Sequence, residues 1–130
     1  MQWNDFRDNI QTSFKELRDN LDFSDVTLAC KDGQNIEAHK FVLFGSSPIL
    51  REIIMNNKHP HPLIYMKGVN AGIMKYIIDF MYYGEVNIFQ DELEVFLELA
   101  QEFKLKGLQN TLGGQNVNSN FINEDYSTSK

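Results

Sequence analysis

Residues 23–47, FSDVTLACKDGQNIEAHKFVLFGSS, give the clearest indication of the fold. Every second residue of 26–30 is apolar or a cysteine, which is the alternation of a half-buried strand. Asp32-Gly33 follows, and this pair predicts a type I′ turn with two residues at positive φ. We therefore expect a β-hairpin with strands over 26–30 and 35–38, followed at once by a short helix over 39–44.

Helical and extended segments alternate on both sides of this hairpin. Apolar residues recur every three or four positions in the predicted helices, whereas the predicted strands are short apolar runs. Pro48 suits the first turn of a helix and Gly84 suits a helix C-cap. We expect helices over 5–20, 48–55, 71–83, 91–103 and 105–112, with further strands over 63–66 and 86–88. Short strands among many helices predict an α+β fold.

The first predicted helix carries one stripe of large apolar side chains on an otherwise polar surface. A stripe of this kind has to pack against something, because exposed aromatic surface is unfavourable in water. The sequence leaves open whether it packs on the core of the same chain or on a second chain. The stripe consists of Phe6, Ile10, Phe14, Leu17 and Leu21.

Composition predicts one folded domain over residues 1–112 and a linker or tail over 113–130. The tail is rich in Gly, Asn and Ser and lacks apolar periodicity, which is typical of disordered segments. The net charge of −6 argues against direct nucleic-acid binding, which requires clustered Lys and Arg. The start of the chain does not resemble a signal peptide, and a single cysteine precludes an internal disulfide, so we expect a soluble intracellular protein.

No residue pattern in the chain predicts catalysis. Pro60 separates His59 from His61, so the pair cannot form a helical i,i+4 metal site, and we expect a polar loop with no metal there. Cys30 alternates with apolar neighbours and is predicted to be a buried core thiol rather than a nucleophile. We expect no enzymatic activity, no cofactor and no metal.

Asp25, His39 and Lys40 form the one polar group that stands out. Asp25 precedes the first hairpin strand and Lys40 follows the second, so antiparallel pairing brings them together. Their arrangement fits a structural ion pair or a helix cap. It also fits a charged pocket at an interface between chains, and both descriptions can hold at once.

Several segments resemble BTB/POZ consensus sequences in order and spacing. They are DVTL (25–28), AHKFVL (38–43), SSP (46–48), DFMYYGEV (79–86) and LKGL (105–108). The resemblance covers residues 3–112. Trp3-Asn4, HPLI (61–64) and GEVNI (84–88) are similar to the tramtrack/bric-à-brac group of this family. The chain departs from that group at Gln2, where the group has an arginine, and at Ile49-Leu50, where an aromatic pair is usual.

The resemblance implies a protein-interaction domain that forms an intertwined homodimer, with assembly up to hexamers known in the tramtrack group. It implies that the first helix packs on its copy and that a strand at Met1–Trp3 pairs with Val86–Ile88 of the other chain. It further implies a nuclear transcription or chromatin factor, with other BTB domains or corepressors as partners. The implied dimer-interface residues are Trp3, Phe6, Ile10, Phe14, Leu17, Val86 and Ile88, and the implied charged pocket is Asp25, His39 and Lys40.

Three other functions remain as alternatives. One is a substrate adaptor of a cullin-3 ubiquitin ligase, although residues 56–62 lack the glutamate that such adaptors carry in this loop. Another is a channel tetramerisation domain, which lacks the long first helix and the AHK element. The last is a generic soluble interaction domain in which the aromatic stripe is ordinary core.

Overall fold

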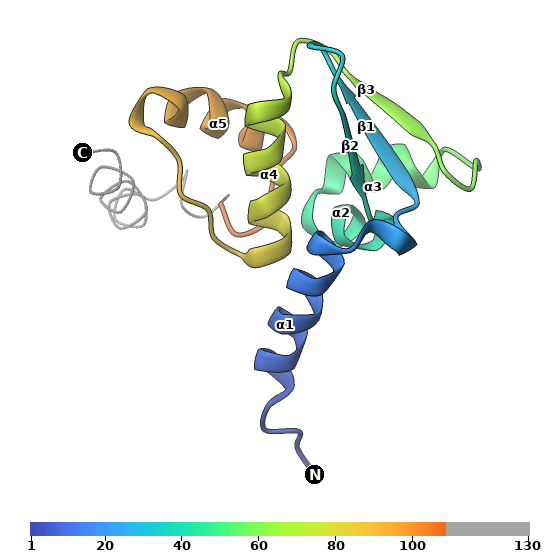
Figure 1. Cartoon of the computed structure of the whole chain (residues 1–130), viewed down its shortest axis with the longest axis vertical. Coiled ribbons are helices and arrows are strands. Elements are labelled where there is room, and N and C mark those ends of the chain that lie inside the picture. Colours follow the sequence, from blue (N-terminus) through green and yellow to red (C-terminus); the bar gives the residue numbers. More distant parts are fainter. Residues whose placement is uncertain (109–130) are drawn as a thin grey trace.

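A small sheet and a cluster of helices form the body of the molecule, and one helix extends from it (Figure 1). The computed structural model describes residues 1–108. In chain order the elements are α1 (Phe6–Asp19), the 3-10 turn η1 (Leu21–Phe23), β1 (Val26–Cys30), β2 (Asn35–Ala38), α2 (Lys40–Ser46), α3 (Pro48–Met55), β3 (Leu63–Met66), α4 (Ala71–Tyr83) and α5 (Gln90–Glu102). This mixture confirms the predicted α+β class.

The sheet has the strand order β2-β1-β3, with β1 in the centre. β1 pairs with β2 in antiparallel register, Val26 opposite Ala38, and with β3 in parallel register, Thr27 opposite Leu63. A parallel neighbour requires a crossover, and α2 and α3 supply it between β2 and β3. β3 is therefore an edge strand, and its far side lies at the outside of the molecule (Figure 1).

The hairpin turn differs from the predicted type. Gly33 has φ 80°, whereas Asp32 is not at positive φ, so the type I′ prediction is wrong. The N–H of Gly33 bonds to the carbonyl of Cys30 (3.1 Å), and the N–H of Cys30 bonds to the carbonyl of Gln34 (2.9 Å). Three residues therefore form the loop, which is the arrangement of a type I turn followed by a glycine bulge.

Local capping interactions define the ends of the central helices. Ser47 accepts from the N–H of Leu50 at the start of α3, with Pro48 in the first turn. Asn70 accepts from the N–H of Ile73 at the start of α4, and Gly84 ends that helix at φ 81°. These bounds agree with the predicted helices over 48–55 and 71–83.

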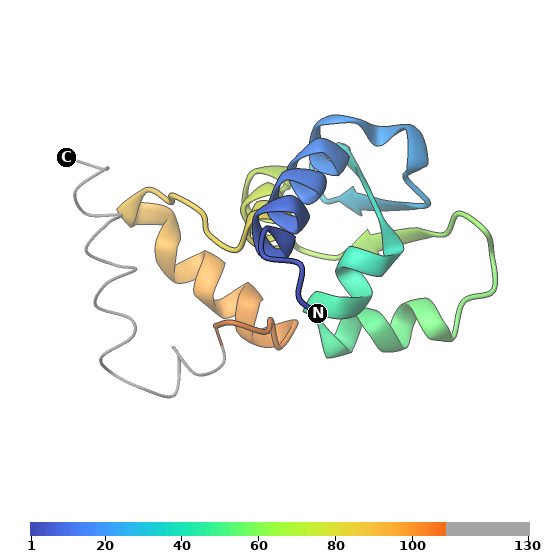
Figure 2. The ribbon, with the colours of Figure 1, turned by 90° about the horizontal axis from the view of Figure 1, so that it is seen from below.

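The core lies between the inner face of the sheet and the central helix α4. Seven of the thirteen residues of α4 are buried, so this helix lies at the centre of the core. Cys30 is also buried, as predicted. α5 packs on α4 and buries Leu93, Phe96, Leu99 and Ala100. Seen from below, α1 crosses the cluster beside α4 (Figure 2).

The C-terminal end of α5 has an unusual residue at its left-handed position. Lys104 has φ 53°, and its N–H bonds to the carbonyl of Gln101 (3.0 Å). The N–H of Leu105 bonds to the carbonyl of Ala100 (3.0 Å). This pair of bonds is a Schellman motif, in which glycine is the usual residue at the position of Lys104.

Besides the turn type, three sequence predictions of local structure are wrong within the described residues. Leu21 lies in η1 and not on the helical stripe, since α1 ends at Asp19. Residues 86–88 form no strand between α4 and α5, where they lie on the side of α4 away from the sheet (Figure 1). Residues 105–108 form turns instead of the start of a helix, with Gly107 at φ 90°. The remainder of that predicted helix and the predicted tail over 113–130 lie outside the described residues.

No helix within residues 1–108 is long and apolar enough to cross a bilayer.

Candidate functional site

Helix α1 leaves most of its apolar stripe uncovered. None of its fourteen residues is buried, although Phe14 and Leu17 pack partly against the core. An ion pair holds the C-terminal half of α1 in place, since Arg18 Nε donates to Asp79 Oδ1 on α4 (3.0 Å). Among residues 1–108 the N-terminal half of α1 forms no ion pair of this kind, and it projects from the body of the molecule (Figure 1).

Large side chains that the core leaves exposed gather on α1 and the start of α2. Trp3 is 59% exposed, Phe6 52% and Phe41 54%. Trp3 and Phe6 stack edge to face with ring centroids 5.1 Å apart, and Phe14 meets Phe41 in the same way at 5.9 Å. We call the exposed residues Trp3, Phe6, Ile10 and Phe41 the α1 surface. Of these residues, Phe41 was not predicted from the sequence, because a phenylalanine in a short helix is expected to lie in the core.

A groove runs between α1, α4 and the loop after α4. Its volume is about 560 Å³, and the loop contributes Glu85, Val86 and Asn87 to its lining. Val86 is half-buried, whereas Ile88 is buried in the core of its own chain. The side chain of Ile88 is therefore not accessible to a second chain in this conformation, although the backbone of 85–87 borders the groove.

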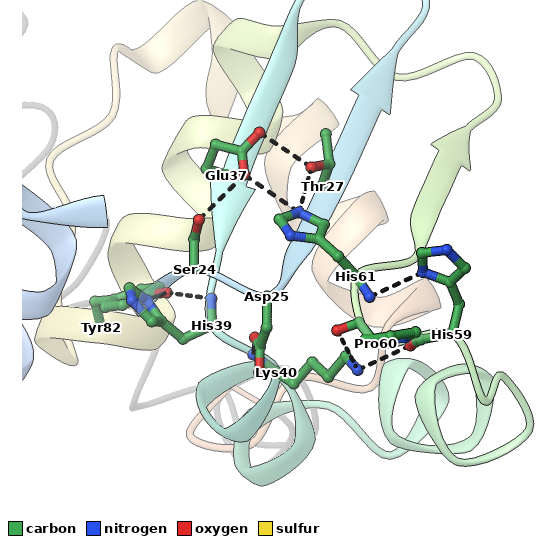
Figure 3. Close-up of polar contacts among 10 residues, drawn as sticks. All are labelled: Ser24, Asp25, Thr27, Glu37, His39, Lys40, His59, Pro60, His61 and Tyr82. Atoms are coloured by element: carbon green, nitrogen blue, oxygen red, sulfur yellow. Dashed lines mark hydrogen bonds and ion pairs between the residues drawn. The ribbon is translucent and has the colours of Figure 1, made fainter. Parts of the chain in front are cut away.

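Asp25 acts as a helix cap supplied from another element (Figure 3). Its Oδ1 accepts a hydrogen bond from the backbone N–H of Lys40 (2.7 Å), the first residue of α2. His39, the N-cap residue itself, makes no side-chain capping bond. The capping alternative drawn from the sequence is therefore confirmed.

The side chain of Lys40 points away from Asp25 towards the loop before β3. Its Nζ donates to the carbonyls of His59 (3.2 Å) and Pro60 (3.1 Å), so it holds the loop against the start of α2 (Figure 3). Asp25 and Lys40 thus lie together as predicted, but their side chains bind different partners. We call Asp25, His39 and Lys40 the α2 junction.

His39 is buried and bonded to Tyr82 of α4. The backbone N–H of His39 donates to Tyr82 Oη (2.9 Å), and the hydroxyl lies 2.8 Å from His39 Nδ1. Because the hydroxyl hydrogen needs an acceptor, we assign it to Nδ1, which leaves the ring proton on Nε2. Nε2 is buried and has no hydrogen-bond partner within the described residues 1–108. Burial lowers the pKa of His39, against an opposing effect of the Asp25 carboxylate, and burial raises the pKa of Tyr82 to about 12.

A second polar cluster ties the same loop to the outer face of the sheet. Thr27 Oγ1 donates to Glu37 Oε2 (3.0 Å) and lies 2.8 Å from His61 Nε2. His61 Nε2 is 3.4 Å from Glu37 Oε1, which also accepts from Ser24 Oγ (3.2 Å). Thr27 and Glu37 therefore hold the ring of His61, which the sequence assigned to an ordinary polar loop. Among residues 1–108 no group of three metal-binding side chains comes together.

Comparison with known proteins identifies the family. The BTB/POZ domain profile matches residues 14–119 of the chain. Three similar proteins come from Drosophila melanogaster. Longitudinals lacking protein-like is 46% identical over 111 residues, which cover 85% of this chain and 87% of that protein. Protein bric-a-brac 1 is 40% identical over 108 residues, covering 83% and 11%, and Protein tramtrack, alpha isoform, is 38% identical over 108 residues, covering 83% and 13%.

The similarity places the chain with the tramtrack and bric-à-brac relatives that its sequence resembles. The chain spans about 11% and 13% of the length of these two proteins. From its profile match and its relatives, the chain belongs to the BTB/POZ domain family.

Proposed function

We propose that the chain is a self-association module, in which two copies form an intertwined homodimer through the α1 surface. The observation that carries the proposal is the exposure of Trp3, Phe6 and Phe41 by more than half, with Trp3 in ring contact with Phe6 and Phe41 in ring contact with Phe14 of α1. BTB/POZ domains are protein–protein interaction modules, which agrees with a surface of this kind.

Burial of this surface supplies part of the driving force. Covering the exposed half of a large apolar side chain is worth about 1 kcal/mol, so four side chains on each of two copies contribute roughly 8 kcal/mol. Association itself costs about 4–15 kcal/mol, so the α1 surface on its own comes close to breaking even. A stable dimer therefore needs a further contribution.

Exchange of the N-terminal segment is the natural source of that contribution. Met1–Trp3 is exposed and forms no strand with its own chain, and Glu85–Asn87 borders the groove beside α4. We propose that Met1–Trp3 of one copy pairs with Val86–Ile88 of the other. Strands of three residues gain stability only when a partner strand is present, which accounts for the absence of strand structure at 86–88 in a single chain.

The same proposal extends to the cellular role. The similarity to bric-à-brac and tramtrack proteins supports a nuclear transcription regulator that this domain joins into dimers and larger assemblies. The adaptor alternative gains no support from the loop over 56–62, which has no glutamate and is held by Lys40 and Glu37.

Solution mass tests the dimer directly. Light scattering after size exclusion, at two concentrations tenfold apart, should give at least twice 15.1 kDa for the chain as it stands. The double variant Phe6→Lys/Ile10→Lys should have a lower mass than wild type, because both side chains are exposed in the single chain and a charge there opposes contact between the two α1 surfaces. Val95→Lys, an exposed position on α5, is the matched control and should not change the mass.

A second measurement covers the case in which the double variant loses its fold. A domain stabilised by dimerisation melts at higher temperature as its concentration rises. Wild-type chain should show this shift. A wild-type mass of 15.1 kDa at both concentrations, with a melting temperature independent of concentration, would refute the proposal.

A further inference from the structure

β3 presents an uncovered edge and an uncovered face. It is the last strand in the order β2-β1-β3, and nothing pairs with its far side in the described part of the chain. Leu63 and Tyr65 point away from the core and are each 61% exposed, whereas Met66 faces inward and is buried. No charged residue or proline lies within the strand, although such residues commonly protect an edge from pairing.

The backbone pattern shows which groups this edge offers. Thr27 N–H bonds to the carbonyl of Pro62 (3.0 Å), so in the parallel ladder residues 62, 64 and 66 direct their backbone groups towards β1. The N–H and C=O groups of Leu63 and Tyr65 therefore point to the open side. The residues with exposed side chains are the same residues that have outward backbone groups.

This edge is complementary to itself. If β3 meets a second β3 in antiparallel orientation with Ile64 opposite Ile64, each Leu63 lies opposite a Tyr65. The backbone N–H and C=O groups of Leu63 and Tyr65 all point outward, so this register satisfies four backbone groups on each strand. Residues opposite each other in an antiparallel pair share a face, so the leucine and the tyrosine also contact each other on the outer side. A register displaced by one residue, with Leu63 opposite Ile64, would place outward-pointing backbone groups of one strand opposite inward-pointing ones of the other.

We propose that β3 is a second self-association site, at which a β3 strand of another copy adds to the sheet with Ile64 at the two-fold centre. The proposal rests on the α1-mediated dimer proposed above and extends it. α1 and β3 lie on different parts of the molecule (Figure 1), so one copy can use both contacts. Each of the two contacts has two-fold symmetry. A copy that uses both is therefore joined to one neighbour through α1 and to another through β3. Dimers then join to dimers, and the mass increases in steps of twice 15.1 kDa.

Charge substitution at the exposed face tests the site. In wild-type chain the mass should exceed twice 15.1 kDa and rise with concentration, whereas Leu63→Lys/Tyr65→Lys should stop at twice 15.1 kDa. Met55→Lys/Val95→Lys alters two comparably exposed residues elsewhere and should assemble like wild type. Circular dichroism should show unchanged helix content in all three proteins, since every altered side chain is exposed.

The variants also separate this proposal from the dimer proposal. If the α1 contact fails and the β3 contact holds, wild type forms a dimer and Leu63→Lys/Tyr65→Lys gives 15.1 kDa. If the β3 contact fails, Leu63→Lys/Tyr65→Lys has the wild-type mass at every concentration, and the inference is overturned. Binding of an extended apolar peptide to β3, with wild type never larger than a dimer, would assign the edge to another partner and overturn it equally.

Cysteine cross-linking tests the register. A hydrogen-bonded antiparallel pair has its Cα atoms about 5.5 Å apart, which lies within the range of a disulfide. A mixture of Leu63→Cys and Tyr65→Cys chains should therefore cross-link on mild oxidation, whereas either variant alone should not. Native Cys30 is buried and serves as an internal control in all samples. Equal cross-linking of the single variants and the mixture would refute the proposed register.

Discussion

Ser47 joins two helices through one buried hydroxyl group. Its Oγ accepts from the N–H of Leu50 (3.1 Å) at the start of α3 and donates to the carbonyl of Phe103 (2.6 Å) at the end of α5. The side chain is fully buried. We predict that Ser47→Ala destabilises the domain without altering the α1 surface or the β3 edge.

The magnitude follows from the two bonds. Loss of an N-cap side chain costs about 1 kcal/mol. Loss of the Ser47 hydroxyl donor to the carbonyl of buried Phe103 costs about 1–3 kcal/mol more. A total of about 2–4 kcal/mol is a large part of the stability of a small domain. At about 4 °C per kcal/mol for a chain of this size, the melting temperature should fall by roughly 8–16 °C.

Urea unfolding followed by circular dichroism, at one fixed protein concentration, measures this change. Ser47→Gly separates the two contributions, because glycine caps a helix nearly as well as serine but cannot bond to Phe103. It should fall between wild type and Ser47→Ala. Ser46→Ala is the control, since Ser46 is adjacent and only half-buried. A Ser47→Ala midpoint equal to that of Ser46→Ala would show that the assigned hydrogen bonds do not stabilise the fold.

Three further predictions concern the C-terminus of α5, the buried histidine and the anchor of α1. Lys104→Gly should stabilise the domain by about 0.5–1 kcal/mol, because the position has φ 53° and glycine adopts it without strain; a lower urea midpoint would contradict the Schellman assignment. Burial lowers the pKa of His39 below its unfolded value, so stability should be complete above about pH 6.5 and decline as the pH falls through the folded-state pKa. Urea midpoints at pH 7.5 and 5 measure this, and the decline should be smaller in His39→Gln; an equal decline in both proteins would assign it to other groups. Asp79→Asn should cost at most about 1 kcal/mol, because its bond to Arg18 is partly exposed. Faster hydrogen exchange confined to α1 would confirm that the ion pair anchors the helix, and unchanged exchange there would rule it out.

The elements set by local sequence were predictable. α4 begins and ends where its apolar pattern and Gly84 place it, and the two hairpin strands follow the alternation over 26–30 and 35–38. The turn between them was not predictable, because Asp32-Gly33 suits both a two-residue turn and the last positions of a three-residue loop. Only the pairing register distinguishes the two, and the register depends on contacts with β3 and the core.

The errors at 86–88 and 105–108 have a related cause. Val86–Ile88 has the residue types of a strand, but three residues form one only beside a partner strand. Residues 105–108 continue an apolar pattern, yet the left-handed turn at Lys104 and the bond from Lys106 N–H to the carbonyl of Ser46 (2.9 Å) direct the chain away from a helix.

The candidate site was predictable in its members and not in its connections. Hairpin geometry brought Asp25 and Lys40 together, and the family resemblance implied a charged pocket that also includes His39. Tyr82, which lies 43 positions from His39, and His59, which lies 19 positions from Lys40, are reached only through the fold. A single sequence carries no signal for contacts at such separations, so a charged pocket could be expected while its bonding could not.

The bonding of the α2 junction affects how mutational data on this domain can be interpreted. Asp25 begins a helix, Lys40 secures the loop that leads into β3, and His39 fixes that helix to α4. A substitution at any of the three that abolishes self-association would therefore not by itself locate a contact between copies. It could equally result from a shift, within one chain, of the elements that support the two proposed association surfaces. Mutagenesis that maps an interface in this domain should therefore use exposed positions such as Phe6 and Tyr65, where loss of binding can be distinguished from loss of fold.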